Sequence, residues 1–277
     1  MKTSRVLFIC IIALSVFASC RMSSEEKAKK RLKESNIEFT ENNFLAKCSS
    51  GDTETVRLFI AAGVSPNIKE NPSGKTPLME DPSGKTALIL ASEYGNLEIV
   101  KALINAGADV NTSAKEFTLD KEVKQIVPKD FKFPENRRIS NTALFFAQFN
   151  DHDEVIKVLL EARADPNVRD WMGRTPLFKA SGMSRSYSKR VVKVLLEGGA
   201  DPNIRSYTGG TPLLMAALWG EREKVEMLLN AGADCSKTYE NGKTVTKIVQ
   251  ESGHETIAYT DQDRLDEVRE VLKSRCK

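Results

Sequence analysis

The sequence predicts an all-α fold, a solenoid of about six helix-turn-helix units with short β-hairpin connections. A Thr-Pro-Leu or Thr-Ala-Leu triplet recurs along the chain, and apolar residues follow each triplet at helical spacing. The most regular copies repeat every 33 residues, as from Thr211 to Thr244. With 277 residues, of which 40% are hydrophobic, the chain has enough apolar material for a continuous core.

Each part of the repeated unit has a physical role, which is clearest in the unit that begins at Thr211. This threonine caps the first helix, and Pro212 occupies the first turn, where its missing N–H would have no partner in any case. Leu213 faces inward, and the small Ala residues after it let two helices approach. Gly232 ends the second helix in a left-handed turn, from which the hairpin to the next unit begins.

Aligning the other copies on the same offsets assigns residues 40–277 to one repeat domain with two insertions at 71–82 and 113–140. The units span approximately 40–70, 83–112, 141–170, 173–206, 209–240 and 241–277. The first lacks its Thr-Pro start and the last is lengthened, which is typical of end caps. One unit alone would leave its apolar face in water, so stability depends on stacking the units.

This combination of triplet, period and Ala-Gly-Ala-Asp ending resembles the ankyrin repeat, over about residues 40–277. The resemblance implies a non-catalytic module that binds partner proteins through a concave surface of hairpin tips and first helices, without a cofactor and as a monomer. Exposed aromatic and arginine side chains are the usual anchors of such interfaces, although each can instead cover a neighbouring unit. The candidate binding residues are Lys69, Arg169, Trp171, Met172, Arg205, Tyr207, Tyr239 and Glu240 at the tips, with Tyr94, Phe149, Met183 and Trp219 on the helices.

The two insertions fall at hairpin tips, where insertions project from one face of a solenoid. The longer one is irregular and is either a disordered loop or a further part of the binding face. In the second case its candidate contacts are Phe117, Phe131, Phe133, Arg137 and Arg138.

The N-terminus predicts export. Residues 1–19 combine two basic residues with an apolar run too short to span a bilayer, and the segment ending at Cys20 resembles a bacterial lipobox. We therefore expect lipid attachment at Cys20, with 20–39 as a solvated tether that is helical in part; the alternative is an ordinary signal peptide cut near Ser19. Arg21 favours the outer membrane, because it is not the Asp that retains some lipoproteins in the inner one. The expected location is the cell envelope, on the outer membrane or the periplasmic face.

Three further cysteines would remain after acylation of Cys20. Cys48 stands at a small-residue helix position and is expected to be buried. Cys235 and Cys276 either pair or stay separate thiols, because sequence does not give the distance between them.

Several chemical motifs are excluded. Gly-Lys-Thr triplets at Gly74, Gly84 and Gly242 lack the earlier glycine and the strand of a phosphate-binding loop. His152 and His254 occupy turn positions that often carry His in this family, so neither a metal site nor a catalytic residue is predicted. The net charge of +3, with 41 basic and 38 acidic residues, gives no basic stripe for nucleic acid.

Two functional hypotheses result. The first is a protein-protein interaction scaffold anchored to the bacterial cell envelope by its N-terminal lipid. The alternative is an envelope redox or enzyme-accessory protein that uses Cys235 and Cys276.

Overall fold

The computed structural model describes residues 22–70, 84–114, 141–150, 152–182, 188–237, 239, 242–251 and 262–276. Several sequence predictions fall outside these residues or concern a side chain that is not described. They are the signal segment 1–19, Cys20, Met183, Glu240, His254, the side chain of Phe149, and all of the insertions except Ser113 and Ala114.

Thirteen α-helices lie in the described residues, and twelve of them form six pairs that match the six predicted units. The pairs are α3 (Glu41–Ser50) with α4 (Thr53–Ala61), α5 (Ala87–Glu93) with α6 (Leu97–Asn105), α8 (Ala143–Phe149) with α9 (Asp153–Glu161), α10 (Pro176–Ser181) with α11 (Ser188–Glu197), α12 (Pro212–Leu218) with α13 (Arg222–Asn230), and α14 (Val245–Glu251) with α15 (Gln262–Arg275).

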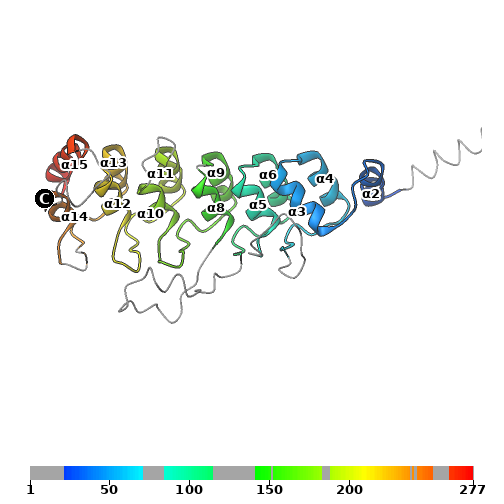
Figure 1. The fold of residues 1–277 in the computed structure, drawn as a ribbon, viewed down its shortest axis with the longest axis horizontal. Coiled ribbons are helices and arrows are strands. Elements are labelled where there is room, and N and C mark those ends of the chain that lie inside the picture. Colours follow the sequence, from blue (N-terminus) through cyan, green and yellow to red (C-terminus); the bar gives the residue numbers. More distant parts are fainter. Residues whose placement is uncertain are drawn as a thin grey trace, which may run out of the picture.

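The pairs stack into two rows of helices (Figure 1). The first helices contact one another from α3 to α14, and the second helices do the same from α4 to α15. The connections project beyond the first row; among the described residues they are hydrogen-bonded turns with one isolated antiparallel bridge, between Lys69 and Thr86. The all-α solenoid predicted from the sequence is therefore confirmed.

The triplet acts as predicted in units two, four and five, whereas the side chain of Thr142 in unit three makes no capping hydrogen bond. The hydroxyl oxygens of Thr86, Thr175 and Thr211 each accept a hydrogen bond, of 3.2 Å, from the backbone N–H three residues later. Helices α10 and α12 begin directly at a proline. In the four triplets that the structure describes, the leucine is at most 1% exposed, so these helices turn this residue into the core.

The core is a single cluster that runs through all the units. Leu88, Leu144, Leu177 and Leu213 occupy equivalent places in four consecutive units, and each packs between the two rows. Truncating such a leucine to Ala typically costs about 2–5 kcal/mol, because a cavity remains.

The segment before the first unit differs from the prediction of a solvated tether over 20–39. Residues Ser24–Glu34 form helix α2, which contacts α4 and joins the core through Ala28 and Leu32. Ser23 and Glu26 form a reciprocal capping box at its start. The tether prediction was wrong for this part, because two buried side chains dock an otherwise charged helix onto the open end of the second row. None of the described helices is both long and apolar enough to cross a membrane.

Asparagine side chains join consecutive hairpins. In each bridge the amide group donates to a carbonyl at the end of the next unit's second helix, while the amide oxygen accepts from a backbone N–H two residues later, at 2.8–3.2 Å. The bridges are Asn67 to Gly107 and Asp109, Asn111 to Arg163 and Asp165, and Asn203 to Gly232 and Asp234.

A disulfide closes the C-terminal end. Cys235, at the start of the last hairpin, is bonded to Cys276, just after α15, with their Cα atoms 5.6 Å apart. Of the two alternatives left open by the sequence, the structure therefore has the pair. Cys48 is buried as predicted, and burial raises the pKa of its thiol to about 12.

Candidate protein-binding surface

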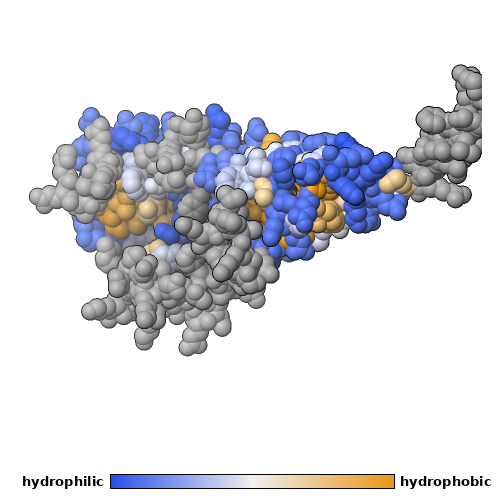
Figure 2. All heavy atoms as spheres, turned by 45° about the vertical axis from the view of Figure 1, so that its right-hand side comes forward, coloured by the Kyte–Doolittle hydropathy of each residue, from blue (hydrophilic) through white to orange (hydrophobic). Residues whose placement is uncertain are grey.

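The surface of interest is where the first helices meet the projecting hairpins; we call it the inner face. Its floor is made by the fourth residue after each capping threonine, which lies opposite the buried leucine on its helix. In units three to six these half-buried residues are Phe146, Lys179, Met215 and Ile248. Figure 2 shows apolar side chains in two areas, one toward the C-terminal end of the stack and one nearer its N-terminal end, and hydrophilic side chains border both.

The basic tip residues reach across to neighbouring units. The Lys69 ammonium donates to the carbonyl of Ser113 at 3.3 Å, and Arg169 donates to the carbonyl of Arg205 at 3.1 Å. The guanidinium of Arg205 in turn lies 5.9 Å from the ring centre of Tyr239. These candidates form a chain along the hairpins, so part of their role is to hold the tips in register.

The two tip tyrosines serve the same purpose. The hydroxyl of Tyr239 is hydrogen-bonded to that of Thr211 at 2.8 Å, and burial raises its pKa. The ring of Tyr207 covers Gly173 so closely that a Cβ there would lie 2.7 Å from it. The backbone N–H of Tyr207 also donates to the carbonyl of Met172, at 2.8 Å. Both tyrosines are only half exposed.

The remaining aromatic candidates are more open. Trp171 is half-buried, with the guanidinium of Arg174 5.8 Å from its ring centre. Trp219 is half-buried beside Gly182, where its indole nitrogen lies 3.5 Å from the position of a Cβ. Tyr94, which follows α5, is 58% exposed, and no other aromatic residue is as open among those described. Tyr94 is therefore the described aromatic candidate with most of its surface available to a partner.

Paired charges border the inner face in two units. The Lys85 ammonium lies 3.0 Å from a carboxylate oxygen of Glu93 and 4.8 Å from the ring centre of Phe146. Lys243 and Glu251 form the same pair in the last unit. In each case the lysine precedes the capping threonine and the glutamate lies seven residues after it. The sequence analysis considered these lysines only as parts of Gly-Lys-Thr triplets.

Unit four has a different arrangement around Asp170. One oxygen of this buried carboxylate accepts from the backbone N–H groups of Met172 and Arg174, at 2.9 Å each. The other lies 2.7 Å from the guanidinium of Arg174 and 3.9 Å from the ammonium of Lys179. Lys179 also lies 5.4 Å from the ring centre of Phe145. Two cations thus share one carboxylate.

The environment of Lys179 disfavours its charged form. Its pKa falls from an ordinary 10.5 to about 8, mainly because burial removes water from the ammonium, and also because Arg174 repels it. The attraction of Asp170 opposes this shift only in part. Helices α8 and α12, which pack on either side of α10, contribute no charged residue.

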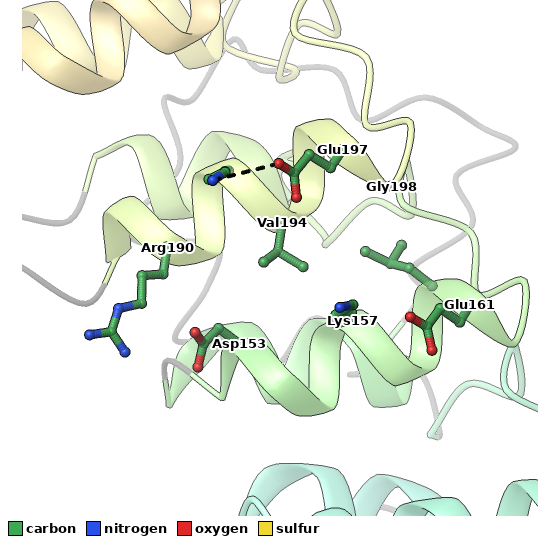
Figure 3. Close-up of a pocket in the computed structure, with 9 residues that line it drawn as sticks. Asp153, Lys157, Glu161, Arg190, Val194, Glu197 and Gly198 are labelled. Carbon is green, nitrogen blue, oxygen red and sulfur yellow. Dashed lines mark ion pairs between the residues drawn. The ribbon is translucent and has the colours of Figure 1, made fainter.

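A separate hollow of about 540 Å³ lies between α9 and α11, in the row of second helices (Figure 3). Leu160 and Val194 supply its apolar lining, and none of the predicted binding residues contributes to it. Its charged rim consists of Asp153, Lys157, Glu161, Arg190, Lys193 and Glu197. The three acidic and three basic side chains of this rim balance in charge, so the hollow shows no preference for a charged ligand.

His152 has a structural role. Its Nε2 lies 3.1 Å from the carbonyl oxygen of Glu93, and because a carbonyl only accepts, this nitrogen donates. Asn150 donates to the same carbonyl at 2.8 Å. Within the described ranges, no group of three or more His, Cys, Asp or Glu side chains is placed to hold a metal.

Comparison with known proteins identifies the repeat. Three overlapping stretches, residues 22–114, 114–206 and 172–239, match the family described as ankyrin repeats (3 copies). The chain belongs to the ankyrin-repeat family. The first match begins at residue 22 and so includes α2, which agrees with the docking of this helix onto the stack.

The chain is also similar to SH3 and multiple ankyrin repeat domains protein 1 of Homo sapiens, Mus musculus and Rattus norvegicus. Each is 25% identical to it over 135 residues, which is 49% of this chain but 5% of the relative. The likeness thus concerns a stretch of ankyrin repeats within much larger proteins. Ankyrin repeats are protein-interaction modules in general, and the family matched here is a repeat family without a chemistry of its own.

Proposed function

We propose that this ankyrin-repeat protein is a non-catalytic scaffold that binds protein partners on its inner face and is held at the bacterial cell envelope by a lipid on Cys20. The anchor would attach it to the outer membrane or leave it facing the periplasm. The partner-binding part follows from the repeats; the anchor part is supported by two features of the chain.

The disulfide between Cys235 and Cys276 is the observation that carries the proposal of export. Such bonds form and persist in oxidising compartments and are rare in the reducing cytosol. With Cys48 buried, none of the three cysteines in the described residues presents an open thiol. That set of cysteines suits a protein that works outside the cytosol.

The position of α2 adds a geometric argument. The helix begins at Ser24, four residues after Cys20, and four residues span at most about 14 Å. An acylated Cys20 would therefore hold the first unit close to the lipid headgroups. Two acyl chains give stable membrane attachment, so the stack would stay at the surface.

The anchor is tested by fractionating cells that express the full chain or its Cys20→Ala variant. We expect the wild-type protein in the membrane fraction, released by detergent but not by salt, and the variant in the soluble fraction. Mass spectrometry of the mature N-terminal peptide should show an acylated Cys20. A mature, unacylated N-terminus would instead support cleavage of an ordinary signal peptide.

Partner binding is tested by photo-crosslinking in intact cells. A photoreactive amino acid replaces Tyr94 on the inner side, and a matched variant carries it at Lys193 on the outer row. We expect specific adducts from position 94 and few from position 193. Equal or absent crosslinking at both positions would contradict a binding role for the inner face.

The redox alternative deserves a direct comparison, because the disulfide borders an open hollow of about 540 Å³ with Lys247 and Glu251 in its lining. A Cys235→Ser/Cys276→Ser protein, assayed where it remains folded, separates the two hypotheses. The scaffold keeps its crosslinked partners without the disulfide. A redox protein loses its activity while its inner face stays intact.

A further inference from the structure

The pairs Lys85–Glu93 and Lys243–Glu251 show that two units of the protein itself place a carboxylate beside a cation at the same position on the inner face. In both units a cation directly before the capping threonine meets a glutamate at the end of the first helix. In the second unit an aromatic side chain of the next unit, Phe146, lies beside the same lysine. This place on the inner face therefore suits a carboxylate.

Unit four keeps the cation of this pattern and lacks the glutamate. Arg174 precedes the capping Thr175, but Gly182 stands seven residues after it, where Glu93 and Glu251 stand in their units. Lys179 adds a second cation one helical turn before this glycine. Both cations reach the surface, with 25% of the Arg174 and 17% of the Lys179 side chain exposed.

The surroundings of Gly182 provide a third polar group and an apolar border. The indole nitrogen of Trp219, a hydrogen-bond donor, lies 3.5 Å from where a Cβ of residue 182 would be. The terminal methyl group of Met215 is 2.9 Å from the same point. One N–H donor and one methyl group thus border a position that has no side chain, in the same unit as Arg174 and Lys179.

We propose that the inner face of unit four binds a carboxylate of a partner protein, an Asp or Glu side chain, in the place that Glu93 and Glu251 fill in their own units. Arg174 and Lys179 attract the carboxylate, and Trp219 donates to it. The apolar residues Phe146 and Met215, at equivalent positions on the flanking helices, contact the residues beside it. This inference names the chemistry of the partner and rests on the scaffold function proposed above.

Charge balance favours this ligand over a cationic one. Asp170 accepts from two backbone N–H groups and pairs with Arg174, and Lys179 lies 3.9 Å from it, so a second carboxylate would reduce the repulsion between the two cations. An arriving carboxylate would compensate the desolvated ammonium, which agrees with the lowered pKa of Lys179. A basic ligand would meet repulsion from Arg174 and Lys179 together.

The site is tested first without any partner, by building the carboxylate into the chain. Gly182→Glu places it where units two and six have it, and Gly182→Gln is the matched neutral control. The backbone at Gly182 has an ordinary negative φ of −91°, and the nearest obstacle is the flexible end of Met215. Competitive trace acetylation followed by mass spectrometry reports the titration of Lys179 in each protein. We expect a higher pKa of Lys179 with Glu than with Gln; equal values overturn the proposed geometry.

The second test uses peptides. A phage-displayed library of random short peptides is selected on the folded wild-type protein, and the selected peptides are measured against Lys179→Gln, Lys179→Arg and the outer-row control Arg190→Gln. We expect an enriched Asp or Glu flanked by apolar residues. Lys179→Gln should weaken binding about tenfold or more, and the other two variants should change it little.

The outcomes separate this inference from the scaffold proposal. Selected peptides that lack an acidic residue and bind Lys179→Gln as well as the wild type overturn the carboxylate site while supporting peptide binding. Selection of no binder counts against the scaffold function, and the titration of the Gly182 variants then still decides whether the site accepts a carboxylate.

Discussion

The side chain of Asn203 and the backbone of Asp234 are joined across two units of the stack. The amide oxygen of Asn203 accepts from the N–H of Asp234 at 2.8 Å, and its amide group donates to the carbonyl of Gly232 at 2.9 Å. One side chain thus fixes the distance and the rotation between consecutive hairpins.

Asn203→Ala should therefore destabilise the protein by about 1–2 kcal/mol, since it removes two hydrogen bonds worth roughly 0.5–1.5 kcal/mol each. Urea unfolding followed by circular dichroism measures the change. Asn105→Ala, at an exposed helical position, is the control and should stay within about 0.5 kcal/mol of wild type. Equal effects of the two substitutions would mean that the bridge does not contribute to stability.

Removing the disulfide should loosen the last unit. The bond links residues 41 positions apart, and a crosslink of this kind typically contributes about 2–4 kcal/mol. Cys235→Ser/Cys276→Ser, or reduction of the wild type, should lower the unfolding midpoint and increase hydrogen exchange in α15 more than in α5. Unchanged exchange in α15 after reduction would show that its packed residues hold it without the bond.

Arg163→Gly should stabilise the protein. Arg163 has a positive φ of 66°, at the helix end where Gly107, Gly199 and Gly232 have φ of 86–88° in their units. Relieving the left-handed strain returns about 1–2 kcal/mol, and the entropy of glycine in the unfolded chain offsets about 0.5–1 kcal/mol. We expect a net gain of about 0.5–1 kcal/mol in urea unfolding. Arg163→Ala keeps the strain and should show no such gain.

The stability contributed by Lys179 should depend on pH. Its folded pKa of about 8 lies below the ordinary 10.5, so the unfolded chain binds more protons between these values and this group's contribution becomes more favourable as pH rises. Below pH 8, where Lys179 is protonated in both the folded and the unfolded chain, its destabilising effect on the folded protein is complete. The stability of Lys179→Gln relative to wild type should accordingly be most favourable near pH 7 and decline toward pH 10.5, measured by urea unfolding at each pH. A constant difference across this range contradicts the desolvation of Lys179.

Much of the fold could be predicted because the units repeat the same helix-start residues and the same buried leucine. Thr175 and Pro176 start α10 as Thr211 and Pro212 start α12, and the leucine that follows each pair is buried. Helix α2 has a start signal in Ser23 and Glu26 but little to predict its docking: Ala28 and Leu32 are its only buried residues, and a charged segment with two apolar side chains resembles a solvated one. The packing of α2 could be seen only in the structure, where this helix lies against the open end of the stack.

The binding surface was less predictable for a related reason. A tyrosine at a hairpin tip looks the same in sequence whether it binds a partner or covers a neighbouring unit, and Tyr207 and Tyr239 both contact the preceding unit. Lys179 was missed because a single lysine on a short helix is usually a solvated residue. Its significance depends on Asp170, Arg174 and Gly182, which the fold brings together.

The two ends of the stack are held by different interactions, so the molecule should unfold from one end first. A covalent bond fastens the final helix, whereas α2 holds the opposite end by two buried side chains and the exposed ion pair of Arg31 with Glu54. Because each unit depends on its neighbours, fraying should begin at the first units and travel toward the last. A protease would then shorten the chain from its beginning, and a pulling force applied there would peel the units away in sequence order.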